Sequence, residues 1–106
     1  MSDYLLGPHA DQHLDEIYEH TARHWGESQA DRYIGMLFQY FLEVAAKDVI
    51  WRSVPAEFGI EGYFGKCDRH FVYWKVLDSG EVGIVAILHE RMHQIDRIRE
   101  IVAQPS

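Results

Sequence analysis

The sequence predicts an α+β fold: an N-terminal antiparallel helical hairpin packed on a mostly antiparallel β-sheet (β-α-α-β-β-β), with a short C-terminal helix. Two patterns lead to this prediction. Between residues 11 and 45, apolar side chains recur at three- and four-residue steps, which is typical of amphipathic helices. Between residues 60 and 88, β-rich runs alternate with turn residues, which is typical of antiparallel strands. At 106 residues the chain is too short for two cores, so we expect residues 1–106 to form one domain.

The first two elements are a short strand and a helix. Residues 4–7 form an apolar run stopped by Pro8, which suits an edge strand at the start of a sheet. From Asp11 the period changes to that of a helix, which we expect to end at Gly26. The apolar stripe of this helix consists of Leu14, Ile17, Tyr18, Thr21, Ala22 and Trp25.

A second helix follows at once, with Ser28 as the expected N-cap and Asp31 completing a capping box. Its apolar face is wide, as in a helix packed against two neighbours. The positions on this face are Ala30, Tyr33, Ile34, Leu37, Phe38, Phe41, Leu42 and Ala45. Because only Gly26 and Glu27 separate the two helices, they should form an antiparallel hairpin.

The second half of the chain predicts three strands and a helix. Residues 48–60 lose periodicity and form a connection. Strands are expected at 60–66, where Gly62 and Gly65 indicate a bulge, at 69–77 and at 82–88. The turn residues 78–80, Asp-Ser-Gly, make the last two strands a hairpin. Helical spacing then continues to Pro105 through Met92, Ile95, Ile98 and Val102.

The strand at 69–77 is apolar on both faces. By strand alternation, Val72 and Trp74 share one face with His70, while Tyr73 shares the other with Phe71. A strand of this kind is either covered twice or left exposed for a partner. The helical hairpin covers one face, so the second face needs the C-terminal helix or another protein.

Composition limits the classes of partner. The net charge is -7 with neutral histidines, from 17 acidic and 10 basic side chains. Tight nucleic-acid binding neutralises several phosphates with lysine and arginine, so we expect no direct sequence-specific nucleic-acid binding. The apolar runs are too short to span a bilayer, and the first residues lack the features of a secretory signal. The single cysteine, Cys67, fits a reducing compartment. We therefore expect a cytoplasmic protein without a membrane partner.

Residues 89–93 match the zinc-binding pattern HExxH, in which His89 and His93 would bind the metal and Glu90 would act as general base. A zinc hydrolase needs this pattern inside a helix and a further ligand downstream. Here His89 ends a predicted strand, and no histidine or cysteine follows His93. A zinc hydrolase is thus a remote alternative, and we expect neither a metal nor another cofactor.

Several separate blocks of the sequence are recognisable. In the helical half they are Leu14-Asp15-Glu16-Ile17-Tyr18-Glu19-His20-Thr21, Trp25-Gly26, Gln29-Ala30 and Tyr33. In the strand half they are Arg69-His70, Asp78-Ser79-Gly80 and Ile87-Leu88-His89 followed by Arg91-Met92. Together these blocks resemble the RelE/ParE toxin superfamily, ParE branch. The resemblance covers about residues 10 to 93, and blocks in a shared order are more specific than one short motif.

This resemblance implies the toxin of a type II toxin-antitoxin system. Such a toxin is inactive while bound to a small antitoxin, usually of ribbon-helix-helix type and encoded by the adjacent gene. When free, a ParE-like toxin inhibits DNA gyrase and is not an enzyme. The RelE branch instead cuts messenger RNA on the ribosome, and this endonuclease is the alternative function. Arg69, His70, Tyr73 and Lys75 are its possible RNA-facing groups, whereas Ala86 replaces an arginine that many relatives carry.

The resemblance also suggests which residues act. The candidates for toxicity and target binding lie at the strand ends and the start of the C-terminal helix: Arg69, His70, His89, Arg91 and Met92. The candidates for antitoxin binding are apolar and aromatic: Tyr73, Trp74, Ile95 and Ile98. We expect no catalytic residue and no metal ligand among them.

Overall fold

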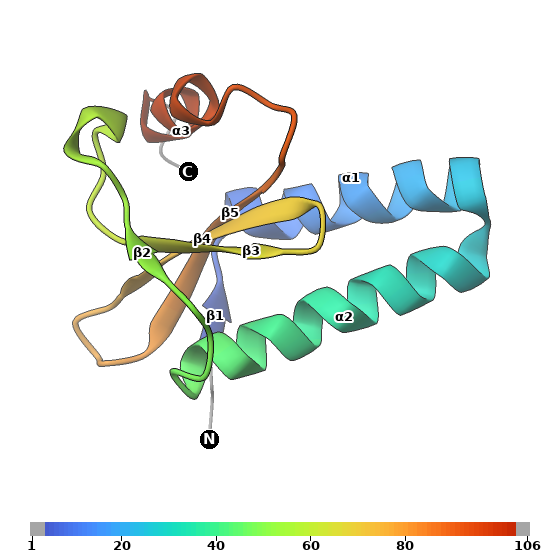
Figure 1. Cartoon of the computed structure of the whole chain (residues 1–106), viewed down its shortest axis with the longest axis horizontal. Coiled ribbons are helices and arrows are strands. Elements are labelled where there is room, and N and C mark those ends of the chain that lie inside the picture. The colour runs from blue at the N-terminus through green and yellow to red at the C-terminus, as the bar shows by residue number, and fades with distance from the viewer. Residues whose placement is uncertain (1–3, 104–106) are drawn as a thin grey trace.

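A five-stranded sheet lies between a helical hairpin and a C-terminal helix, which confirms the α+β prediction (Figure 1). The computed structural model describes residues 4–103. The strands are β1 (Tyr4–Leu6), β2 (Arg52–Ser53), β3 (Tyr63–Cys67), β4 (His70–Val76) and β5 (Val82–His89). The helices are α1 (Pro8–Trp25), α2 (Glu27–Ala45), the 3-10 helix η1 (Ala56–Phe58) and α3 (Gln94–Ala103). None of the helices in the described range is long and apolar enough to cross a membrane.

The sheet has the order β1-β5-β4-β3-β2 and is mostly antiparallel, as the sequence predicted. Only β1 runs parallel to its neighbour, and it pairs with no more than Val82 to Ile84 of β5. The chain leaves this edge through Gly7, whose N–H donates to the Ile84 carbonyl at 2.9 Å. Pro8 then starts α1, where its missing N–H costs no hydrogen bond. This is why α1 begins at Pro8 and not at Asp11.

Each face of the sheet has its own core. The hairpin side buries Leu14, Leu37 and Phe41 of the helices against Val72 and Trp74 of β4. The opposite side buries Tyr73 and Leu88 with Val54, Ala86 and Ile98. The second apolar face of β4 is therefore covered by α3 and the η1 segment of the same chain, and η1 is tied to α3 by Arg99, which donates to the Glu57 carbonyl at 2.7 Å.

The hairpin turn does not contain the predicted capping box of Ser28 and Asp31, so that prediction was wrong. Gly26 has a φ of 93°, ends α1 and is also the N-cap of α2, which begins at Glu27 without a side-chain cap. A positive φ that glycine tolerates lets the chain reverse within one residue, so the helix starts before Ser28 can cap it. Asp31 has another role, because its carboxylate accepts a hydrogen bond from the Tyr18 hydroxyl of α1 at 3.0 Å.

Three further features of the second half of the chain differ from the prediction. The connection 48–60 contains β2 and η1, and the next strand begins at Tyr63. The irregularity in the sheet lies opposite β5, between Tyr73 and Trp74, and not at Gly62 or Gly65. The C-terminal helix begins at Gln94, so Met92 precedes it.

Gly65 is required for the close packing of α2 on β3. A methyl group at this position would overlap the Tyr40 hydroxyl and lie 2.9 Å from the Ile50 carbonyl oxygen. We predict that Gly65→Ala lowers the free energy of unfolding by about 1–3 kcal/mol, as overpacking does. Gly35→Ala is the control, because its methyl group on α2 meets nothing within 4 Å and should raise stability by up to about 1 kcal/mol. Urea unfolding measures both; equal stabilities would contradict the prediction.

Candidate functional site

A cleft of about 1180 Å³ separates the helical hairpin from the ends of β4 and β5. Its walls come from α1, the start of α2, the turn between β3 and β4, and the segment after β5. All five residues predicted for target binding line this one cleft: Arg69, His70, His89, Arg91 and Met92. The structure therefore brings together residues that are up to 23 positions apart in the sequence.

Strand pairing places these residues side by side. His70 begins β4, His89 ends β5, and the two are register partners with ring centroids 5.2 Å apart. One step further out, the Glu90 N–H donates to the Arg69 carbonyl at 2.8 Å. Arg69 and Arg91 therefore lie at the same end of the β4–β5 pair.

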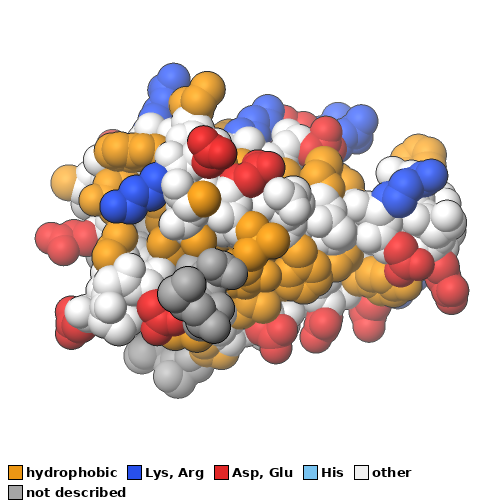
Figure 2. Space-filling view, turned by 90° about the horizontal axis from the view of Figure 1, so that it is seen from below, with side chains coloured by type: hydrophobic (Ala, Val, Ile, Leu, Met, Phe, Trp, Pro, Cys, Tyr) orange, Lys and Arg blue, Asp and Glu red, His pale blue; other side chains and the backbone are white. Residues whose placement is uncertain are grey.

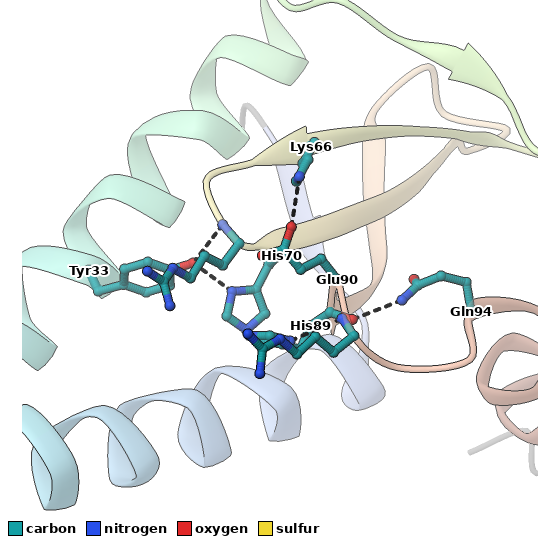
Figure 3. A network of polar contacts seen from close by, with 8 residues as sticks. Tyr33, Lys66, His70, His89, Glu90 and Gln94 are labelled. Atoms are coloured by element: carbon teal, nitrogen blue, oxygen red, sulfur yellow. Dashed lines mark hydrogen bonds and ion pairs between the residues drawn. The ribbon is translucent and has the colours of Figure 1, made fainter.

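Tyr33 of α2 holds His70 from the hairpin side (Figure 3). Its hydroxyl lies 2.6 Å from Nδ1 of His70 and also accepts the Arg69 N–H at 3.4 Å. Burial raises the pKa of Tyr33 to about 12, so the phenol keeps its proton and donates it to Nδ1. Burial, followed by the charge of His89, lowers the pKa of His70 to about 4, so His70 is neutral at pH 7.

His13 of α1 closes the opposite wall. β1 ends at Leu6, so the N–H of Ile87 on β5 has no strand partner on that side. Nδ1 of His13 accepts this N–H at 3.1 Å, which satisfies a backbone donor that would otherwise be buried without one. The bond requires an unprotonated Nδ1, and burial lowers the pKa of His13 in agreement with that state.

Gln94 fixes the turn that follows β5. Its amide donates to the carbonyls of His89 at 2.8 Å and Met92 at 3.0 Å. Its carbonyl accepts the Tyr73 hydroxyl at 2.7 Å, which connects the turn to the middle of β4. The Arg91 N–H also donates to Nδ1 of His89 at 3.1 Å. Arg91 and Met92 therefore extend from a backbone held at several points.

The five residues of the HExxH pattern do not form a helix. His89 is the last residue of β5, a turn follows, and α3 begins only after His93. Glu90 forms an ion pair with Lys66 at 2.8 Å, and this hydrogen bond lowers the pKa of the Glu90 carboxyl. The helical arrangement that a zinc hydrolase requires of this pattern is thus not adopted by residues 89–93.

The charge of the cleft differs from that of the chain. Among the described residues, two acids line it, Glu16 and Asp68, against four arginines: Arg32, Arg69, Arg91 and Arg97. These are four of the ten basic but only two of the 17 acidic side chains. The cleft also holds five of the seven histidines. It is a locally cationic surface on an acidic protein.

The antitoxin-binding candidates do not share a surface. Trp74 lies in the core on the hairpin side, whereas Tyr73 and Ile98 lie in the core under α3. All three are at most 6% exposed, because each fills the interior of its layer. Ile95 alone among the four is half-buried and reaches the surface.

Sequence reasoning missed several residues that build the site. Tyr33 and Trp25 were assigned to apolar stripes of the helices, and Gln94 carried no signal at all. The role of His13 depends on β1 ending before Ile87, which no pattern within α1 indicates. The roles of Tyr33, Trp25 and His13 arise only when the hairpin is docked on the strand ends, and that of Gln94 only when α3 is docked beside β4.

The family model and the relatives that match this chain carry the same family name. The family model described as the ParE toxin of type II toxin-antitoxin systems, parDE, matches residues 4–94. Proteins named Toxin ParE1 from two strains of Mycobacterium tuberculosis are each 34% identical over 98 residues, covering 91% of this chain and 96% of theirs. A protein named Toxin ParE from Escherichia coli is 31% identical over 100 residues, covering 94% of this chain and 96% of its own.

The neutral state of His70 makes stability depend on pH. Below its ordinary pKa of 6.5 the unfolded chain gains a proton at His70, whereas the folded chain gains it only near pH 4. The stabilisation is therefore complete above pH 6.5 and is lost as the pH falls toward 4. We predict that His70→Asn lowers the thermal midpoint at pH 7 and that its difference from wild type shrinks between pH 6.5 and 4.

Circular dichroism melts at four pH values measure this difference. His93→Asn is the control, since His93 is exposed and its side chain forms no hydrogen bond, ion pair or ring contact within residues 4–103. The control should follow the wild-type profile. A His70→Asn difference that stays constant from pH 7 to pH 4 would show that burial does not disfavour the charged imidazole.

Proposed function

The chain belongs to the ParE toxin family of type II toxin-antitoxin systems, and we propose that it inhibits DNA gyrase while it is free of its antitoxin. The observation that carries this proposal is the cleft, which gathers every residue expected to contact the target. An inhibitor that acts by binding needs exposed side chains on a rigid support. Three exposed side chains meet that requirement, because they project from a hydrogen-bonded strand end and turn: Arg69, Arg91 and Met92.

The kinds of side chain in the cleft favour a protein target. Arginine, methionine and tryptophan are enriched at protein interfaces. Met92 is 41% exposed and Trp25 is 73% exposed, and both line the cleft. A partner that covers these two side chains removes their apolar surface from water, which stabilises the complex.

We further propose that a small antitoxin of ribbon-helix-helix type, encoded by the adjacent gene, neutralises the toxin. Figure 2 shows apolar side chains gathered on the face that includes α2, with acidic side chains along one border. Phe38 and Leu42 are 38% and 42% exposed and lie one helical turn apart on α2. This apolar surface suits the antitoxin better than the buried Tyr73, Trp74 and Ile98.

The ribosome-dependent mRNA endonuclease is the second candidate, favoured by the arginines beside His70 and His89. Arginines of this kind stabilise phosphate charge in a transition state. The sheet face itself offers less, because Tyr73 is 2% exposed and Ala86 is buried beside it. His70 is also buried, with 8% of its surface exposed. We therefore rank the endonuclease below the gyrase inhibitor.

Purified toxin should block DNA supercoiling by gyrase and accumulate cleaved DNA, because a bound inhibitor holds the enzyme before religation. Addition of the antitoxin in equimolar amount should restore supercoiling. Agarose gels of plasmid topoisomers measure both. Unchanged supercoiling at tenfold molar excess of toxin would rule out gyrase as the target.

The order of events in cells separates the two candidates. After induction of the toxin gene, gyrase inhibition should damage DNA before protein synthesis falls, whereas an mRNA endonuclease should cut transcripts first. Pulse labelling of protein synthesis and primer extension on abundant transcripts, sampled together with a DNA-damage reporter, measure this order. Cut transcripts before any DNA damage would favour the endonuclease.

A further inference from the structure

The two arginines at the mouth of the cleft have no partner inside the described part of the chain. Within residues 4–103, neither the Arg69 nor the Arg91 guanidinium forms a hydrogen bond or ion pair. Glu90, next to Arg91 in the sequence, is paired with Lys66 at 2.8 Å and does not line the cleft, whereas Asp68, next to Arg69, lines the cleft but forms an ion pair with neither arginine. Both guanidinium groups are thus available to an external oxyanion.

Their separation is set by the backbone and not by flexible loops. Arg69 precedes the first residue of β4, and its carbonyl accepts the Glu90 N–H. Arg91 follows one residue later and is anchored to His89. Two arginines held at one strand end form a fixed pair, which reduces the entropy lost when a ligand with two acidic groups binds.

The surroundings of this pair indicate a peptide and not a nucleic acid. A nucleic-acid strand has a charge at every nucleotide and needs a continuous row of cations, whereas the chain has a net charge of -7. The cleft instead combines the arginine pair with the exposed apolar side chains of Trp25 and Met92. Carboxylates alternating with apolar side chains complement such a surface.

We propose that the cleft binds a segment of gyrase that carries carboxylate side chains next to apolar ones, with Arg69 and Arg91 pairing with the carboxylates. Trp25 and Met92 cover the apolar side chains of this segment. The inference rests on the proposed function, because it assigns the chemistry of the target surface. It makes the acidic toxin and its target meet through a locally cationic surface.

Charge reversal tests the assignment with a matched control. Arg69→Glu/Arg91→Glu changes the net charge by the same amount as Arg23→Glu/Arg52→Glu, and Arg23 and Arg52 are exposed and do not line the cleft. Binding to the gyrase holoenzyme, without DNA, is measured by biolayer interferometry at low and high salt. We expect the cleft variant to bind about 100-fold more weakly, because like charges then face each other, and the control to stay within about threefold. Wild-type affinity should fall as salt increases.

A second variant keeps the test independent of folding. Trp25→Ala removes an exposed side chain and should weaken binding by about fivefold while leaving the thermal midpoint unchanged. Equal losses for the cleft and control charge variants would overturn the proposal, as would binding that requires DNA, which would indicate phosphodiester contacts. If wild type inhibits gyrase but the cleft variants inhibit equally well, this inference fails and the proposed function stands. If wild type neither binds nor inhibits gyrase, the proposed function itself fails.

Discussion

The antiparallel pairing of β4 with β5 is the constraint on which the rest of the structure depends. It fixes which side chains of β4 face the hairpin and which face α3, and it steps from Ala86 opposite Tyr73 to Ile84 opposite Trp74, which leaves Val85 of β5 without a register partner. The same pairing places His70 opposite His89. A slip of one residue would exchange the two cores and also separate the residues of the cleft. Fold and site are therefore specified by one register.

Buried polar contacts then connect the three layers around that register. Tyr33 joins the hairpin to the start of β4, His13 joins it to β5, and Gln94 joins the start of α3 to both strands. Contacts of this kind require a matching donor and acceptor, and an unmatched group in the same place would cost stability. These contacts fix the positions of the start of β4, of β5 and of the turn that follows β5 between the two apolar layers.

Much of this arrangement could be predicted from the sequence, and the failures share a cause. Periodicity located the hairpin and the three long strands, since those signals repeat over many residues. Periodicity failed where an element depends on one or two residues. Gly26 starts α2 before Ser28, and β2 is only two residues long. The resemblance to known toxins located Arg69 and Arg91, but Tyr33 and His13, which hold His70 and the Ile87 amide beside them in the cleft, lie 37 and 74 residues from those partners. No local pattern encodes such a pairing.

The short outer strands have a consequence for how partners approach. β2 covers two residues of β3, and β1 covers three of the eight residues of β5. Long open edges invite strand addition and aggregation, whereas here Nδ1 of His13 accepts the N–H of Ile87, which lies on β5 beyond the residues that β1 covers. Another polypeptide cannot extend the sheet at that position without displacing an imidazole. At this position of β5, recognition is therefore left to side chains, which discriminate between partners in a way that backbone ladders do not.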